Sequence, residues 1–99
     1  MASSIEHNGN QAKGTFRIRN KYGIHARPAA LIVKTAHGFD SEILVEKDGN
    51  SVSGRSIMGL MSLEAGCGSV VNITASGEDS KEALKQLENL IVERKFDED

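Results

Sequence analysis

The chain has 99 residues, of which 38% are hydrophobic and 26% are charged, with a single proline, and this size and composition are typical of one compact globular domain. Its formal net charge of -2 comes without a cluster of basic residues, which argues against nucleic acid as a partner. The one cysteine cannot form an intramolecular disulfide and no apolar run reaches the ~20 residues of a membrane span, so the sequence predicts a cytoplasmic protein with no membrane insertion.

Both ends of the chain are polar and are predicted to lie outside the folded domain. Residues 1–13 contain one large apolar side chain besides Met1, and the chain ends in the acidic sequence Phe-Asp-Glu-Asp. Segments this polar bury too little apolar surface to become ordered by themselves. We therefore expect a flexible N-terminal tail over residues 1–13, a folded domain over residues 14–93 and an acidic C-terminal tail over residues 94–99.

The first strand and the first helix are separated by a turn. Residues 15–19 alternate polar and apolar side chains, which is typical of a strand with Phe16 and Ile18 on one face. An Asn-Lys-Tyr-Gly turn follows, and then Pro28 precedes an apolar run; proline is tolerated in the first turn of a helix but not further inside it. A helix is therefore predicted over residues 26–37, with a buried stripe formed by Ala29, Ile32, Val33 and Ala36.

The next segment is predicted to form a hairpin and a short helix. Residues 40–47 alternate again, an Asp-Gly pair gives a strong two-residue hairpin signal, and residues 50–53 form the returning strand. Ser56 is well placed to cap a short, apolar helix over residues 55–63.

The last strand and the last helix complete the predicted order. Residues 69–75 form a β-branched run with alternation, which indicates a fourth strand. Asp79, followed three residues later by Glu82, resembles a capping box for a final helix with an apolar stripe of Ala83, Leu84, Leu87, Leu90 and Ile91. The order β-α-β-β-α-β-α predicts a two-layer α+β fold, with three helices on one face of the sheet and the other face open to water.

The strongest candidate for chemistry lies in residues 22–28. The three histidines show no metal-ligand spacing, and neither a nucleophilic triad nor a phosphate-cradling glycine loop is evident, so we expect no metal and no cofactor. His25 is placed at a helix N-terminus, where unpaired N–H groups and the helix dipole favour an anion, and Arg27 adds a positive charge. A neutral imidazole there could attack phosphorus, but a histidine that only caps the turn fits the same pattern.

Three motifs of the chain resemble the HPr family of phosphocarrier proteins of the bacterial phosphotransferase system. They are GIHARPAA at residues 23–30, SIMGLMSL at residues 56–63 and SGED at residues 76–79, and the similarity spans residues 14–92. The resemblance implies a cytoplasmic open-faced β-sandwich with a four-stranded antiparallel sheet. It also implies a carrier rather than an enzyme, which takes a phosphoryl group from phosphoenolpyruvate-charged enzyme I and gives it to EIIA proteins.

The resemblance also implies roles for individual residues. His25 matches the histidine that is phosphorylated through Nδ1, and Arg27, with the helix-start amide of Ala26, would stabilise the phosphoryl group. Ser56 matches a serine that a dedicated HPr kinase/phosphorylase modifies as a regulatory mark. The partner-docking surface is matched by the apolar residues Ile57, Met58, Leu60 and Met61. Because a helix this apolar cannot bury every side, we expect some of these side chains to face inward and some outward.

Alternatives remain open on the sequence alone. The ending of the chain looks like that of NPr, the paralogue of the nitrogen-related branch, so a role in sugar uptake and a role in that branch both stay open. A non-transferring regulatory module switched by Ser56 is a rival of another class, which the presence of His25 disfavours. A small hydrolase that uses His25 lacks an identifiable acid partner. We expect a monomer.

Overall fold

The computed structural model describes residues 4–98. Two strands come first, followed by a helix, a hairpin, a short helix, a strand and a C-terminal helix that continues into a π-helical and a 3-10 turn. Their bounds are β1 Ser4–Asn8, β2 Gln11–Arg17, α1 Ala26–His37, β3 Glu42–Lys47, β4 Asn50–Ser53, α2 Ile57–Ser62, β5 Val70–Ser76 and α3 Ser80–Glu88, then a π-helical turn η1 Asn89–Glu93 and a 3-10 turn η2 Lys95–Asp97.

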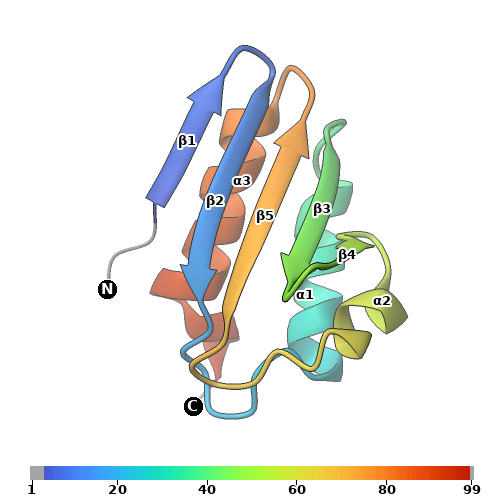
Figure 1. The fold of residues 1–99 in the computed structure, drawn as a ribbon, viewed down its shortest axis with the longest axis vertical. Helices are drawn as coiled ribbons and strands as arrows, with labels where there is room; N and C mark the ends of the chain where they lie inside the picture. The colour runs from blue at the N-terminus through green and yellow to red at the C-terminus, as the bar shows by residue number, and fades with distance from the viewer. Residues whose placement is uncertain (1–3, 99) are drawn as a thin grey trace.

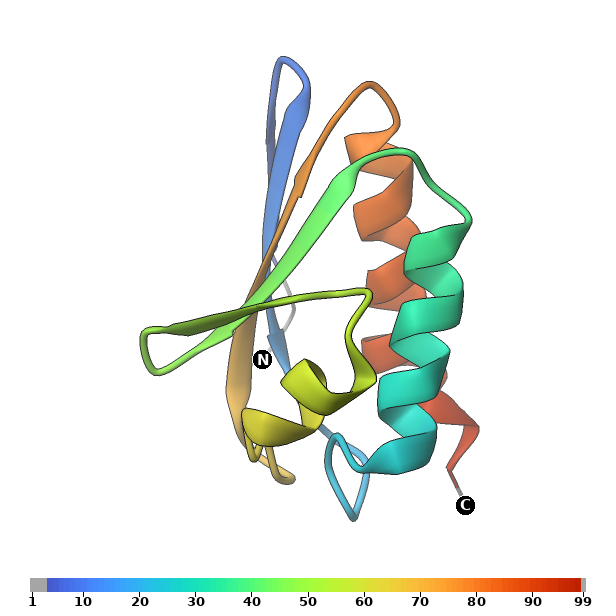
Figure 2. The same cartoon turned by 90° about the vertical axis from the view of Figure 1, so that its right-hand side faces the viewer.

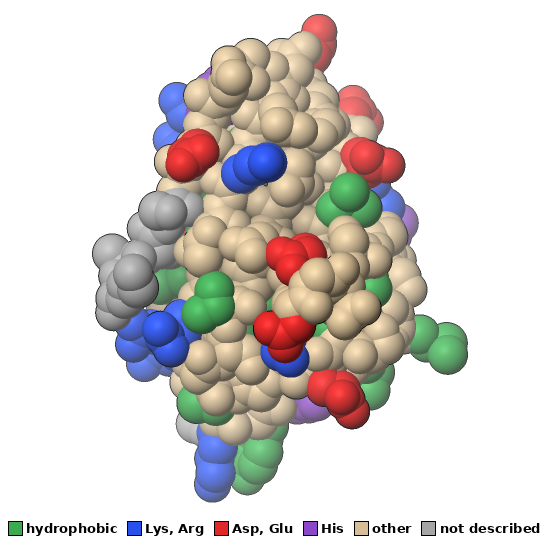
Figure 3. Space-filling view, viewed as in Figure 1, with side chains coloured by type: hydrophobic (Ala, Val, Ile, Leu, Met, Phe, Trp, Pro, Cys, Tyr) green, Lys and Arg blue, Asp and Glu red, His purple; other side chains and the backbone are tan. Residues whose placement is uncertain are grey.

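The strands form one antiparallel sheet in the order β1-β2-β5-β3-β4. The helices lie on one side of the sheet (Figures 1 and 2), which confirms the predicted α+β class and the open-faced two-layer arrangement. Figure 3 views the opposite side, where charged side chains of both signs mix with scattered apolar ones. No helix within residues 4–98 has the length and apolar character that crossing a membrane requires.

The sheet has five strands, so the predicted four-stranded sheet is wrong, and the predicted flexible tail is wrong for residues 4–13. β1 pairs with β2 from Ser4 opposite Thr15 to Asn8 opposite Gln11, while residues 1–3 lie outside the described part of the chain. Backbone hydrogen bonds hold such a strand in place, because they form whether the side chains are polar or apolar. The residues of β2 alternate in burial from its start, with Ala12 buried.

A glycine conceals the beginning of β2 in the sequence. Gly14 occupies an inward-facing position of the strand. A large apolar side chain at such a position would normally reveal the strand in the sequence. A Cβ atom at Gly14 would lie 2.4 Å from the ring of Phe16, which covers this position. The apolar alternation is therefore visible only from Phe16 onward, although the strand starts at Gln11.

The core lies between the sheet and the helix layer. Its largest fully buried side chains come from both layers: Phe16, Ile18, Ile43, Val45 and Ile73 from the sheet and the segments that continue it, and Ile32, Leu60, Leu84, Leu87, Leu90, Ile91 and Phe96 from the helices and the turns after them. Burying one such side chain contributes about 1.5–3 kcal/mol. This packing fixes α1 and α2 relative to the sheet and thereby positions the loops at their ends.

The start of α3 differs from the predicted capping box. Asp79 has φ -97° and ψ 20°, and its side chain makes no capping bond to its own helix. Instead its carboxylate accepts hydrogen bonds from the backbone N–H groups of Asp40, at 2.8 Å, and Ser41, at 3.0 Å, and from the Ser41 hydroxyl. The hydroxyl bond, followed by the Asp40 N–H, lowers the pKa of Asp79 below its ordinary value. Asp79 thus ties α3 to the loop between α1 and β3.

Candidate functional site

A fixed loop between β2 and α1 carries His25. Gly23 has φ +68°, and a Cβ atom there would lie 2.3 Å from the carbonyl oxygen of Ala65, so both the conformation and the close approach require glycine. The N–H of Ile24 donates to the same oxygen at 2.8 Å, and the Ile24 side chain is buried. The loop is thus held against the segment that follows α2, and His25 is delivered to the first position before α1.

His25 stands at the N-cap of α1 without capping the helix through its side chain. Its backbone is extended, with φ -91° and ψ -165°, and its side chain makes no capping bond. The helix begins at Ala26 and ends at His37, as predicted. The imidazole, whose side chain is 44% exposed, is therefore available for contacts outside the helix.

The start of α1 presents backbone donors beside His25. The first helical hydrogen bond runs from the Ala29 N–H to the His25 carbonyl oxygen at 2.9 Å. The N–H groups of Ala26 and Arg27 have no hydrogen-bond partner among the described residues, and Pro28 has no N–H. Together with the helix dipole, these donors make the space beside the ring favourable for an anion.

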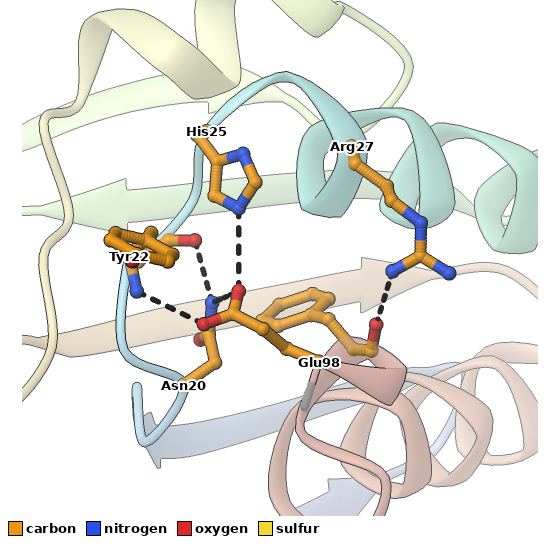
Figure 4. A network of polar contacts seen from close by, with 7 residues as sticks. Asn20, Tyr22, His25, Arg27 and Glu98 are labelled. Carbon is orange, nitrogen blue, oxygen red and sulfur yellow. Dashed lines mark hydrogen bonds and ion pairs between the residues drawn. The ribbon is translucent and has the colours of Figure 1, made fainter.

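Arg27 projects from the first turn of α1 toward the C-terminal segment. Its Nη1 donates to the carbonyl oxygen of Phe96 at 2.8 Å (Figure 4). The sequence predicts that Arg27 lies beside a bound phosphoryl group; in the structure its guanidinium contacts the chain end that folds against the site.

The C-terminal segment packs on the site, so the expected acidic tail outside the folded domain is wrong for residues 94–98, while residue 99 lies outside the described part of the chain. The side chain of Phe96 is fully buried, and Arg94 forms an ion pair with Asp97. After the π-helical turn Asn89–Glu93, the residues Lys95, Phe96 and Asp97 all have positive φ, at 49°, 56° and 56°. These left-handed residues turn the chain back toward the loop that carries His25.

This turn brings the side chain of Glu98 to the site. One Glu98 carboxylate oxygen, Oε1, accepts a hydrogen bond from the Tyr22 N–H at 3.1 Å. The other, Oε2, accepts one from Asn20 Nδ2 at 3.0 Å and lies 3.3 Å from His25 Nε2 (Figure 4). The Asn20 bond, with smaller contributions from Tyr22 and His25, lowers the pKa of Glu98, so the carboxylate is an anion at neutral pH.

Sequence reasoning missed Asn20, Tyr22 and Glu98 as parts of the site. Asn20 and Tyr22 lay in a recognised turn, but nothing local indicates that the Asn20 amide is buried and donates to the Gly23 carbonyl oxygen at 2.7 Å. Glu98 is 73 residues away from His25 along the chain. The one available signal was Phe96, an aromatic residue within a charged ending, which is unusual for a solvated tail.

The short helix α2 confirms the predicted cap and the predicted split of its apolar residues. The Ser56 hydroxyl accepts a hydrogen bond from the Gly59 N–H at 2.9 Å. Ile57, Met58 and Met61 are exposed, Met58 by 83%. Leu60 is fully buried, so its predicted place on a docking surface is wrong: it points into the core. We call Ile57, Met58 and Met61 the α2 patch; α2 packs against α1 (Figure 2).

Comparison with known protein families identifies a match over most of the chain. Residues 12–93 match the family model "PTS HPr component phosphorylation site". The match contains the loop of His25, α1, α2, the strands β3, β4 and β5, and all of β2 except its first residue.

Individual proteins and structures give the same result. The chain is 46% identical over 85 residues to a phosphocarrier protein HPr of Treponema pallidum, which covers 86% of this chain and 96% of that protein. It is 49% identical over 76 residues to the HPr-like protein Crh of Bacillus subtilis, covering 77% of this chain and 89% of Crh. A crystal structure of HPr from Thermoanaerobacter tengcongensis matches with a TM-score of 0.83 and 53% identity, over 88% of this chain and 97% of that one. HPr of that organism has also been solved as a dimer. A chain of the dimer matches with a TM-score of 0.68 and 51% identity, over 81% of this chain and 92% of that one.

Proposed function

Because this chain belongs to the HPr family of phosphocarriers of the phosphotransferase system, we propose that it carries a phosphoryl group on His25. In the proposed step the lone pair of Nδ1 attacks the phosphorus of the phosphorylated donor. The bond from nitrogen to phosphorus forms, and the bond from phosphorus to the donor breaks with its electron pair remaining on the donor. The reverse sequence passes the group to the acceptor protein, so the carrier is regenerated.

The observation that carries this proposal is the imidazole beside unpaired helix donors. The N–H groups of Ala26 and Arg27 have no partner among residues 4–98, and a phosphoryl dianion on the ring would supply one. The Arg27 guanidinium is attached to the same turn and would add charge-assisted hydrogen bonds if it left the Phe96 carbonyl oxygen. A histidine that merely capped the helix would bond to these donors, and His25 does not.

The partners of the proposed transfer are enzyme I as donor and EIIA proteins as acceptors. The α2 patch supports a docking role because three apolar side chains are exposed on a helix that packs against α1, the helix that begins at His25. A surface of this kind is typical of the apolar centre of a protein interface. Identifying which EIIA proteins accept the phosphoryl group would separate sugar uptake from the nitrogen-related branch. We propose that the carrier acts as a monomer, a point that light scattering of the purified protein tests directly.

The proposal is tested by phosphorylation with labelled phosphoenolpyruvate and an enzyme I of an HPr-containing system. We expect one phosphoryl group per chain, which is labile in acid and stable in alkali. His25→Ala should take up none, whereas His37→Ala, which changes an exposed histidine at the other end of α1, should be labelled like the natural sequence. Equal labelling of His25→Ala would refute the carrier role of His25.

A second candidate function is regulation through Ser56. We propose that an HPr kinase/phosphorylase modifies its hydroxyl, which is half-buried and accepts the Gly59 N–H. The modified group would place negative charge beside the α2 patch and so change partner docking. Incubation with such a kinase and ATP should add one phosphate that Ser56→Ala abolishes; label that persists in Ser56→Ala would contradict the assignment. Were His25 never labelled while Ser56 was, the chain would be a non-transferring regulatory module.

A further inference from the structure

The contact between Glu98 and His25 joins the chain end to the ring that is proposed to be phosphorylated. The distance from Glu98 Oε2 to His25 Nε2 is 3.3 Å, and the Glu98 side chain is only 14% exposed. Figure 4 shows that the other ring nitrogen, Nδ1, points away from the carboxylate. The two nitrogens therefore have different surroundings.

The chemistry of the carboxylate determines which ring nitrogen carries a proton. An ionised carboxylate can only accept hydrogen bonds, and Glu98 already accepts them from Asn20 and Tyr22. A ring nitrogen next to it is favoured only as N–H. In a neutral imidazole this places the proton on Nε2 and the free lone pair on Nδ1.

We propose that Glu98 is a positioning residue for phosphoryl transfer, which holds the His25 proton on Nε2 and stabilises the ring as Nδ1 forms its bond to phosphorus. This inference rests on the proposed function of His25 as the phosphoryl acceptor. Nδ1 supplies the electron pair of the new bond, the donor keeps the electron pair of the broken one, and Nε2 retains its proton. The ring consequently changes from neutral to positively charged, beside a carboxylate that compensates the new charge.

The backbone of the C-terminal turn supports a functional role for the contact between Glu98 and His25. Three consecutive residues without glycine, Lys95 to Asp97, adopt left-handed conformations, which cost free energy and concentrate at functional sites. One residue, Arg94, separates them from a π-helical turn, Asn89–Glu93, a feature that is also frequent at such sites. The Phe96 side chain and the bond from Arg27 to the Phe96 carbonyl oxygen hold the turn in place. The strained segment delivers the Glu98 carboxylate to the ring.

The test uses the full chain and phosphoramidate, a small phosphoryl donor that needs no protein docking and releases ammonia. Glu98→Ala removes both the acceptor and the charge, whereas Glu98→Gln keeps an acceptor oxygen without the charge. Asp97→Asn is the matched control: it removes one negative charge from the same turn, but Asp97 pairs with Arg94 and not with the ring. Two quantities are measured, the rate of His25 phosphorylation and the protonation of each ring nitrogen in 15N spectra of the unphosphorylated protein.

In the natural sequence we expect a hydrogen-bonded, slowly exchanging Nε2–H and an unprotonated Nδ1, with phosphorus coupled to Nδ1 after reaction. Glu98→Ala should slow phosphorylation by about tenfold, the effect of losing one charge-assisted hydrogen bond, and should lose the slowly exchanging Nε2–H. Glu98→Gln should slow the reaction while keeping that signal, and Asp97→Asn should stay within about twofold of the natural sequence.

A proton on Nδ1 in the natural sequence would overturn the proposal, and so would an unchanged rate in Glu98→Ala. A slower Glu98→Ala whose ring spectrum is unchanged would also overturn it, because Glu98 would then act only through the fold. Failure of the carrier role is distinguishable: His25 would take no phosphoryl group from enzyme I, while the ring spectra would still report whether Glu98 holds Nε2–H.

Discussion

Gly23 determines the position of His25, and we predict that it cannot be replaced by alanine. Its φ of +68° disfavours any side chain, and the added Cβ would meet the Ala65 carbonyl oxygen at 2.3 Å. Since that oxygen belongs to the backbone and accepts the Ile24 N–H, it cannot move aside without breaking the loop contact. Gly23→Ala should lower the free energy of unfolding by about 3 kcal/mol or more and slow phosphorylation of His25, as measured by urea unfolding and by labelling.

Gly9 provides a matched control for this prediction. It has nearly the same conformation, with φ +61°, but an added Cβ would meet nothing within 4 Å. Gly9→Ala should therefore show only the conformational cost, about 1–2 kcal/mol, with normal labelling of His25. Equal losses of stability in the two variants would show that the contact with Ala65 does not matter.

Asp79 is predicted to make stability depend on pH. Its pKa in the folded protein lies below the ordinary value, first because of the Ser41 hydroxyl. A depressed carboxyl pKa contributes stability above the ordinary pKa of the unfolded chain, and this contribution is lost as the pH falls through the lower pKa of the folded protein. The stability difference between the natural sequence and Asp79→Asn should thus be full at neutral pH and shrink in acid, as measured by urea unfolding across that range.

The control removes a carboxylate without these bonds. Glu78 is the exposed neighbour of Asp79, and Glu78→Gln should change the free energy of unfolding at neutral pH by no more than about 0.5 kcal/mol. If the stability difference between the natural sequence and Asp79→Asn were constant from neutral pH into acid, the hydrogen bonds to Asp40 and Ser41 would not be the source of the stabilisation by Asp79.

At the scale of single elements, α2 is predicted to act as the docking surface through its exposed side chains. Met58→Glu places a charge in the centre of the α2 patch and should lower the efficiency of phosphorylation by enzyme I about tenfold. Phosphorylation by phosphoramidate needs no docking and should be unchanged. Steady-state labelling with both donors measures the two effects separately.

The open face of the sheet supplies the control for α2. Leu44 in β3 is also an exposed apolar side chain, but it lies on the sheet and not on α2. Leu44→Glu should therefore be labelled normally by both donors. A loss of enzyme I labelling in Leu44→Glu that matched the loss in Met58→Glu would show that docking is not confined to the α2 patch.

At the scale of the whole molecule, local signals predicted the fold well and distant contacts escaped prediction. Pro28 marks the first turn of α1 by its own backbone preference, and an Asp-Gly pair sets the β3–β4 hairpin, so these elements are where the sequence placed them. β1 was missed because its place depends on backbone pairing with β2, and Gly14 hides the alternation there. The candidate site also depends on a distant contact. His25 was identifiable because it precedes a predicted helix, whereas Glu98 lies 73 residues away from it along the chain.

The C-terminal turn is therefore predicted to be part of the folded domain, which Phe96→Ala tests. Phe96 is fully buried, and truncating a buried phenylalanine costs about 3–5 kcal/mol, a large share of the roughly 5–15 kcal/mol that stabilises a small domain. The same change should release Glu98 from His25, so the signal of the slowly exchanging Nε2–H should weaken and the urea midpoint should fall.

The control is Met58→Ala, at a site that is 83% exposed, which should change stability by no more than about 0.5 kcal/mol. A loss below about 1 kcal/mol in Phe96→Ala would mean that the turn is not held by this side chain, and that the bond from Arg27 to the Phe96 carbonyl oxygen holds it instead.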